Sequence, residues 1–450
     1  MYSPPTFAHN SFRGMKVRVS GYIALWLISL ALGSQRLQAQ FLVDLIDTTA
    51  TADKGLWAIY KKADHLMISG YFQPQFQVTS EKGAKTFSGG DFAKNSNNRF
   101  TIRRGRIRFD YAHFAPDGKP QAQVVFQFDG SEKGVAIRDF WGRYYENRWE
   151  LFTFTAGMFA RPFGYEVNLG SGDRESPERA RMSQTLMRVE RDLGMMATFE
   201  PRKKSNRLRM FKIDLGVFNG QGLTGPDEYD SYKDLIGKIS LKSTPVAKNI
   251  LLSASASILE GGIEQNSKYV YRMMKEQGAG VFVVDSSLAN LGRKAPRKYR
   301  GADAQLKFLN PWGNTELRME YWWGTQSSAA EETFTPGLLL NEPYYIRRFQ
   351  GAIFYFLQNV ISEKHQVGFK YDSYDPNIDL KGNAIGKSNT NSHSGDVRFH
   401  TIGMGYTYWF NKQVKLVLWL DLVRNERTSL TGYSNDIHDN VFTSRIQFRF

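Results

Sequence analysis

Apolar and polar residues alternate with a period of two along this chain, and this alternation limits its fold more than any other feature. Near the end, Phe442, Ser444, Ile446, Phe448 and Phe450 share one parity and Thr443, Arg445, Gln447 and Arg449 share the other. Side chains of a strand point to opposite faces in turn, so each parity is one face. The same alternation recurs at 414–422, 402–410, 366–372 and 121–129. This periodicity predicts an all-β chain.

Composition excludes several other classes of protein. None of the 450 residues is Cys, so the chain has no disulfide framework, thiolate metal site or Cys nucleophile. A mean hydropathy of −0.44 argues against a helical protein that crosses a membrane several times. Aromatic residues make up 14% of the chain, which together with the regular pattern argues against disorder.

The first residues have the pattern of an export signal. Lys16 and Arg18 precede an apolar run at 21–33, and a site of small residues ends at Ala39. We therefore expect a secretory signal peptide at 1–39, although a short N-terminal anchor is the alternative. Residues 40–67 are expected to form a periplasmic N-terminal extension with a short helix near 53–62. The barrel is expected at 68–450.

The choice between a soluble and a membrane barrel depends on which face carries charge. In lipid, strands can span only as a closed barrel, whose apolar face is outward and whose lumen is polar. Arg, Lys, Gln or Asp occupy the polar face of nearly every expected strand, and Tyr and Trp cluster near strand ends, as at 141–145, 321–323 and 406–409. An amphipathic last strand ending on Phe450 resembles the assembly signal of bacterial outer-membrane barrels. The sequence therefore predicts an exported transmembrane antiparallel β-barrel in the outer membrane.

The number of strands and the lengths of the links define a topology. Sixteen strands are expected near 68–79, 100–112, 120–130, 134–145, 150–159, 193–201, 208–218, 234–243, 250–260, 300–308, 315–325, 346–357, 364–374, 398–410, 413–424 and 441–450. Apart from the brief link 131–133, long and short links alternate, which is typical of long external loops and short periplasmic turns. The run Val281–Val284 could be an additional hairpin, which would give eighteen strands.

Basic residues on the polar faces are candidates for a pore lining. The phase of the alternation slips near Arg104-Gly105, as a β-bulge would cause. On either side of the slip, Arg103, Arg106 and Arg108 are expected to face the lumen. The same assignment applies to Lys212, Lys238, Lys242, Lys370, Lys415, Arg445 and Arg449. Such a column attracts anions, or it only keeps the lumen wet by pairing with Asp110, Asp129, Asp214, Asp372 and Asp421.

The long segment 160–192 is a candidate constriction. It carries six Arg, including Arg161 and Arg179, and six acidic residues. A link of this length is usually functional. Folded into the barrel, it would narrow the pore and place charges there. The alternative is a solvated external loop.

At this segment the chain resembles a known family. The residues Gly157-Met158-Phe159-Ala160-Arg161-Pro162-Phe163-Gly164-Tyr165-Glu166, followed by Ser176-Pro177-Glu178-Arg179, are similar to those of the phosphate-selective porin O and P family of Gram-negative outer membranes. The resemblance extends to 103–110 and to the last strand. It implies a sixteen-stranded, trimeric barrel whose third loop folds into the lumen, and a basic ladder. Arg161 and Arg179 would then line the constriction, and Gly157, Pro162, Phe163, Gly164, Glu166 and Glu178 would form the loop motif.

These observations together predict a passive outer-membrane porin for anions, with phosphate or similar oxyanions as solutes. We expect no catalytic residues, no metal, no cofactor and no nucleic-acid partner, because no His lies in a recognisable catalytic signature and the basic charge is explained by a lumen. The expected partners are small anions, outer-membrane lipid and two further copies in a homotrimer. Two alternatives remain. One is a barrel that serves as a scaffold or accessory of a secretion or surface complex, and the other is a channel for organic solutes such as sugars.

Overall fold

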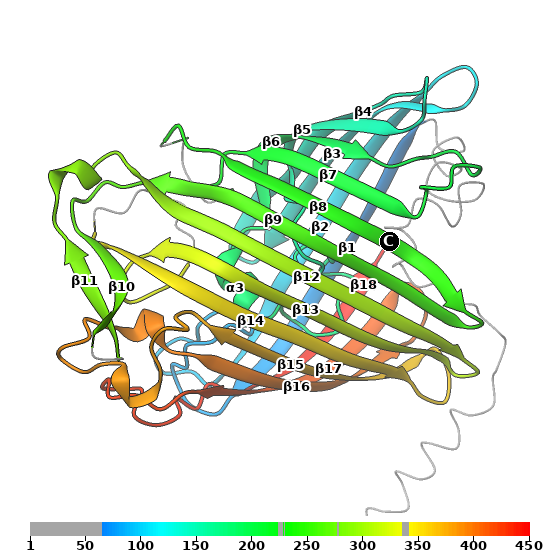
Figure 1. Ribbon diagram of the computed structural model, residues 1–450. Helices are drawn as coiled ribbons and strands as arrows, with labels where there is room; N and C mark the ends of the chain where they lie inside the picture. The colour runs from blue at the N-terminus through cyan, green and yellow to red at the C-terminus, as the bar shows by residue number, and fades with distance from the viewer. Residues whose placement is uncertain (1–64, 224–227, 229, 277–278, 335–341) are drawn as a thin grey trace, which may run out of the picture. The chain divides into compact units, whose positions relative to one another are not determined.

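Sixteen antiparallel strands of the described residues form one closed wall in the computed structural model (Figure 1). The structure describes residues 65–450 except 224–227, 229, 277–278 and 335–341. The predicted signal peptide 1–39 and the predicted extension up to residue 64 lie outside them. The wall strands are β1 (Leu66–Thr79), β2 (Asn98–Phe114), β3 (Pro120–Ser131), β4 (Gly134–Tyr145), β5 (Phe152–Ala160), β6 (Arg191–Phe199), β7 (Phe211–Phe218), β8 (Asp234–Ala247), β9 (Ile250–Glu264), β12 (Lys294–Asn310), β13 (Gly313–Ser328), β14 (Tyr344–Asn359), β15 (His365–Asp375), β16 (Phe399–Trp409), β17 (Val414–Asn425) and β18 (Val441–Arg449).

The wall closes because β1 pairs with both the next strand and the last one. Phe72 lies opposite Gly105 of β2 on one side and opposite Phe448 of β18 on the other. Every other wall strand pairs with its neighbours along the chain, and β9 pairs directly with β12. A closed sheet has no free edge, so the backbone groups of the wall are paired within it. The predicted sixteen-stranded antiparallel barrel is confirmed.

The additional hairpin foreseen at Val281–Val284 exists, but it is not part of the wall. Strands β10 (Val270–Glu276) and β11 (Ala279–Asp285) pair with each other, and β10 adds a short parallel contact with Tyr344–Ile346 of β14. Since β9 pairs with β12 and bypasses both strands, the hairpin is an insertion in the β9–β12 loop. The wall therefore has sixteen strands and not eighteen.

The apolar face of the wall points outward. Phe442 and Phe448 of β18 are 39% and 44% exposed, whereas Thr443, Arg445 and Gln447 between them are buried. A water-soluble barrel would show the reverse, because it buries its apolar face. An outward apolar face is what a barrel presents to lipid. Among the described helices, none is long and apolar enough to cross a bilayer.

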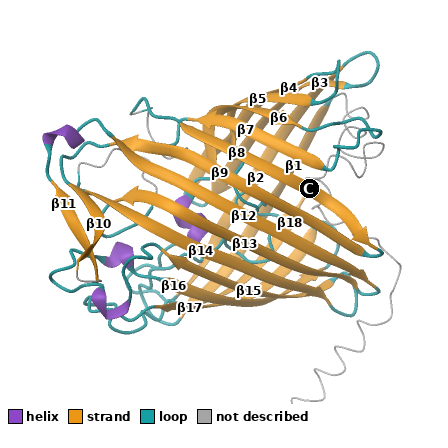
Figure 2. Cartoon of the chain, viewed as in Figure 1, coloured by secondary structure: helices purple, strands orange, loops and turns teal. Residues whose placement is uncertain are grey.

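Long loops and short turns lie at opposite ends of the barrel. The links 80–97, 161–190, 219–233, 265–293, 329–343, 376–398 and 426–440 begin at one end, which also has the brief link 132–133. The links 115–119, 146–151, 200–210, 248–249, 311–312, 360–364 and 410–413 lie at the other end. Figure 2 shows the long loops gathered at the first end, with short helices among them, and a further helix inside the barrel. The helices are α3 (Arg181–Leu186), η2 (Leu288–Asn290), η3 (Gly382–Ala384) and η4 (Ser394–Asp396).

Candidate functional site

The β5–β6 link, residues 161–190, folds into the barrel, and we call it the inward loop. It joins two neighbouring strands, yet it contacts strands around most of the wall. The Tyr165 N–H donates to Glu320 of β13, and Lys415 of β17 donates to the Gly172 carbonyl. A loop anchored at β5 and β6 can reach these strands only across the interior. Helix α3 of this loop is seen within the barrel in Figure 1.

The first part of the family-like motif attaches the inward loop to β13, on the side of the barrel opposite β5 and β6. Gly164 has φ +63°, and a Cβ there would lie 2.2 Å from Glu320 Oε1. The same Glu320 carboxylate accepts the N–H groups of Tyr165 and Glu166, each at 2.9 Å. Phe163 is fully buried and packs edge-on against Trp322, with ring centroids 4.8 Å apart. These contacts explain why the loop requires a Phe-Gly pair at this point.

Other residues of the motif shape the loop itself. The Glu166 carboxylate accepts the Ala180 N–H at 3.0 Å and the Ser183 hydroxyl, and thereby ties the loop's start to α3. Pro162, which precedes Phe163 and Gly164, is buried as well. Gly157 has φ +120° on β5, where a Cβ would lie 2.4 Å from the Phe140 carbonyl oxygen. The residues of the motif are therefore explained by the backbone conformation of the loop and by the contacts that attach it to the wall.

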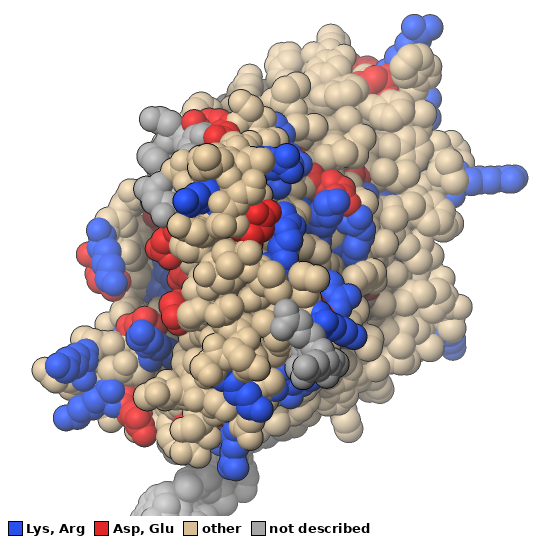
Figure 3. All heavy atoms as spheres, turned by 60° about the vertical axis from the view of Figure 1, so that its left-hand side comes forward, with Lys and Arg blue, Asp and Glu red and all other residues tan. Residues whose placement is uncertain are grey.

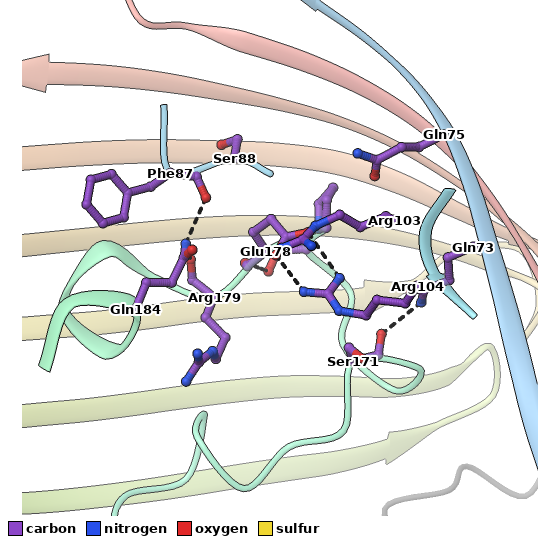
Figure 4. A network of polar contacts seen from close by, with 12 residues as sticks. Gln73, Gln75, Phe87, Ser88, Arg103, Arg104, Ser171, Glu178, Arg179 and Gln184 are labelled. Atoms are coloured by element: carbon purple, nitrogen blue, oxygen red, sulfur yellow. Dashed lines mark hydrogen bonds and ion pairs between the residues drawn. The ribbon is translucent and has the colours of Figure 1, made fainter. Parts of the chain in front are cut away.

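Glu178 is the strongest attachment of the inward loop to the wall (Figure 4). Its carboxylate accepts from Arg103 at 2.8 and 3.0 Å, from Arg104 at 3.1 and 2.7 Å, and from Arg445 at 2.9 Å. Burial alone would raise the pKa of Glu178, but the three guanidinium groups outweigh it and hold that pKa well below 4.5. Glu178 is therefore ionised at neutral pH and remains so in mild acid.

A β-bulge explains how two consecutive arginines reach one carboxylate. Gln73 pairs with Arg104 and Pro74 pairs with Ile102, so Arg103 is an extra residue on β2. In a regular strand neighbouring side chains point to opposite faces, whereas a bulge re-aims one of them. The predicted phase slip near Arg104-Gly105 is thus present at Arg103. Strict alternation places Arg104 on the apolar face, so its position in the lumen was not predicted from the sequence.

A second bulge on β4 repeats this arrangement. Gln127 pairs with Asp139 and Phe128 pairs with Ile137, which leaves Arg138 as the extra residue. Arg138 forms an ion pair with Glu190, at the other end of the inward loop, and lies 3.5 Å from Asp129. The two bulges therefore each direct an arginine to a loop carboxylate. Arg138 was not among the predicted lumen residues, and its signal in the sequence is a short break in the alternation of β4.

Several other predicted lumen cations hold the backbone or side chains of the inward loop. Lys238 donates to the Gly164 carbonyl at 2.5 Å, Lys415 donates to the Gly172 carbonyl at 2.9 Å, and Arg449 pairs with Asp173 at 2.7 Å. These side chains face inward, and the structure shows them bound to protein oxygens.

The two arginines expected at the constriction organise the loop from within. Arg161 donates to the Val189 carbonyl, and so joins the beginning of the loop to its end. Arg179 donates to the carbonyls of Met187 and Arg188 at 3.2 and 3.3 Å, just beyond α3, and lies 3.6 Å from Glu190. Burial, and then the charge of Arg174, lowers the pKa of Arg179 to about 9.

Solvent reaches the interior along β2 and β7. The inward-facing side chains of Arg108 and Lys212 remain 34% and 35% exposed, although each has an acidic neighbour on its own strand. Arg143 of β4 donates to Thr155 and lies over Trp141, with the guanidinium 5.0 Å from the ring centroid, and Arg108 lies 5.9 Å from the same ring. These groups form a basic face on one side of the lumen.

The remaining predicted lumen cations are paired with carboxylates. Arg106 pairs with Asp129 at 3.0 Å, and Lys242 pairs with Glu200 at 2.8 Å. Lys370 is buried between Asp372 at 3.3 Å and Asp421 at 3.8 Å. Pairing keeps the wall polar and lowers its net positive field.

Arg174 of the inward loop is a buried arginine with unpartnered donor atoms. It is only 6% exposed, and its Nε and Nη1 atoms have no hydrogen-bond partner. Burial, and then the positive charge of Arg104, lowers its pKa to about 10. The sequence placed Arg174 in the expected constriction segment, but it did not distinguish this residue from the other arginines there. We call Arg103, Arg104, Arg174, Arg445 and Glu178 the arginine cluster.

Comparison with known proteins supports the fold. No protein-family model matches this chain, and no curated protein matches it. The outer membrane channel DcaP of Acinetobacter baumannii is similar in structure, with a TM-score of 0.50 and 13% identity over 86% of this chain and 97% of DcaP. An anion-selective porin from Comamonas acidovorans gives a TM-score of 0.49 and 11% identity over 86% of this chain and 99% of that porin. The similarity to DcaP shows a porin-type barrel fold, and the closed wall with its apolar exterior is that of a barrel that spans a membrane.

Proposed function

We propose that this barrel is a passive channel that lets small anions, including phosphate and similar oxyanions, cross the outer membrane. The long-loop end then faces the outside and the short-turn end faces the periplasm. Sixteen strands enclose more space than side chains of the wall fill, so such barrels leave an aqueous path. The exposed inward faces of Arg108 and Lys212 support such a path here.

The observation that carries the preference for anions is the arginine cluster. Three guanidinium groups bind one carboxylate inside the barrel, on the loop that narrows it, and the charges of Arg104 and Glu178 act on a fourth, that of Arg174. The nearby Glu166 and Glu175 are engaged, with Ala180 and with Arg318 respectively. Excess positive charge in a water-poor surrounding attracts anions and repels cations.

The chemistry of arginine supports oxyanions in particular. The planar guanidinium donates in a fork that matches two oxygens of a phosphate. Two donor atoms of Arg174 lack a protein partner, and an oxyanion would supply one. A chloride ion would satisfy the charge but not the geometry of both donors.

A planar-bilayer recording tests this proposal. We expect that, under a KCl gradient across a bilayer that contains the purified protein, the reversal potential lies closer to the equilibrium potential of chloride than to that of potassium. Millimolar phosphate is expected to reduce the chloride current. In Arg174→Gln that phosphate effect should fall about tenfold, which corresponds to one charge-assisted hydrogen-bond pair.

Arg424→Gln is the matched control, because Arg424 is exposed at the long-loop end and outside the cluster. It should behave as wild type. A reversal potential set by potassium would refute the anion preference, and an unchanged phosphate effect in Arg174→Gln would refute the assignment of the site. A sealed barrel without conductance would favour the scaffold alternative.

Two expectations accompany the proposal and remain predictions. The homotrimer implied by the family resemblance is tested by light scattering of the protein in detergent. The signal peptide is tested by N-terminal sequencing of the exported protein, which should begin at Gln40.

A further inference from the structure

A cavity of about 690 Å³ lies at the long-loop end and borders the arginine cluster at Arg103. The lining comes from the β1–β2, β13–β14, β15–β16 and β17–β18 loops and from α3 with the residues that follow it. The wall contributes Arg103 of β2, Tyr374 of β15 and Phe399 of β16. Figure 3 views this end of the barrel, where basic and acidic side chains both gather. A volume of this size is sufficient for a small organic molecule.

Aromatic rings and guanidinium groups stack in this cavity. The Arg181 guanidinium lies 4.1 Å from the ring centroid of Phe87 and 3.6 Å from that of Phe399. The Arg188 guanidinium lies 4.8 Å from the centroid of Phe334, which in turn stacks on Phe87 at 5.7 Å. Four separate segments of the chain thus contribute to one stack of alternating charge and ring.

Polar groups of the lining lack protein partners. Thr185 is 3% exposed and its Oγ1 has no hydrogen-bond partner, and the same holds for Nε of the buried Arg181, one helical turn earlier. In the described part of the chain, no carboxylate forms an ion pair with Arg188. By contrast, the cavity's Glu331 is bound to Ser394 and His393. The two buried lining atoms without a partner can therefore both donate, while Asp91, Glu331 and Glu332 supply the acidic part of the lining.

We propose that this cavity is a second solute site, and that it binds planar organic carboxylates before they pass the inward loop. The carboxylate accepts from Arg188 and from the free donors on α3. The ring of the solute packs on Phe334 and its aromatic neighbours. Inorganic phosphate has no apolar part that could pack on these aromatic rings. This inference rests on the proposed channel function, because the cavity then lies on the solute's path.

Benzoate is a suitable probe, with acetate as the carboxylate without a ring and benzamide as the ring without a charge. In a planar bilayer, benzoate added at the long-loop side is expected to interrupt the current at concentrations where acetate and benzamide do not. Addition at the short-turn side should be at least several-fold less effective. The Arg188→Gln and Phe334→Leu variants should each weaken the benzoate effect about tenfold.

Arg348→Gln is the matched control, because Arg348 is exposed at the same end of the barrel but does not line the cavity. It should retain the wild-type benzoate effect. Equal interruption by acetate and benzoate, or a benzoate effect that both cavity variants retain, would overturn the site. If the protein does not conduct, calorimetric titration of benzoate into the detergent-solubilised barrel and the two variants decides the same question.

The two proposals fail separately. A potassium-set reversal potential with cavity-dependent benzoate binding would refute the anion preference and support this site. A chloride-set reversal potential without cavity-dependent benzoate binding would leave the channel function intact and overturn the site.

Discussion

Replacement of Glu178 by Gln tests the central structural argument, which is that the inward loop is held against the wall by one carboxylate. The variant keeps the shape of the side chain but removes the charge that pairs with three arginines. The side chains of Glu178, Arg104 and Arg445 are 10% exposed or less, so the values measured for surface ion pairs do not apply. Removal of one partner from a buried ion pair costs about 3–5 kcal/mol.

Two measurements check this expectation. Denaturant titration of the folded barrel should show a free energy of unfolding about 3–5 kcal/mol lower in Glu178→Gln than in wild type. Single-channel recording should show a larger or less steady conductance, because the loop loses its attachment to β2 and β18. Glu331→Gln, a change on another long loop whose side chain is exposed, should cost less than about 1 kcal/mol. Equal stability and conductance in wild type and Glu178→Gln would refute the argument.

Three further predictions concern pH, backbone geometry and the lipid face. Because the arginines hold the pKa of Glu178 well below 4.5, its contribution to stability is present above pH 4.5 and is lost only as the pH falls through that lowered pKa. The difference in unfolding free energy between wild type and Glu178→Gln should therefore stay constant from pH 7 to 4.5, and a change of this difference within the window would contradict a lowered pKa of Glu178. Gly164→Ala should destabilise the barrel by about 1–3 kcal/mol in denaturant titration, since φ is positive and the new Cβ meets Glu320, whereas Gly142→Ala, with no atom closer than 3.9 Å, should be nearly neutral. Met319→Arg, at a side chain 62% exposed on the outer face, should cost about 2–4 kcal/mol in a lipid-based unfolding titration, and a neutral result would mean that this face does not contact lipid.

The alternation of residue types was sufficient to predict the wall. Strand positions agree with the structure to within a few residues for most strands, as in 134–145 and β4. The prediction that 160–192 folds inward also agrees, since residues 161–190 lie in the barrel. For the link 261–299, the sequence left open whether the wall has sixteen or eighteen strands, because a two-stranded insertion and two wall strands have the same local pattern. Only the direct pairing of β9 with β12 distinguishes them.

Predicting the roles of the basic residues was harder, for a physical reason. Parity shows that Arg445 and Lys238 face inward, but it does not show what they meet there. Arg445 binds Glu178, 267 residues earlier in the chain, and Lys238 binds the carbonyl of Gly164. Contacts over such separations depend on where the inward loop lies, which no local pattern records.

A closed barrel with a polar interior follows from local sequence, because strand faces and link lengths depend on neighbouring residues. Which cations hold the inward loop depends on long-range packing. Two β-bulges are part of this packing. The bulges at Arg103 and Arg138 turn side chains inward against the alternation. The two arginines then form ion pairs with Glu178 and Glu190 of the inward loop, whose positions depend on the tertiary structure.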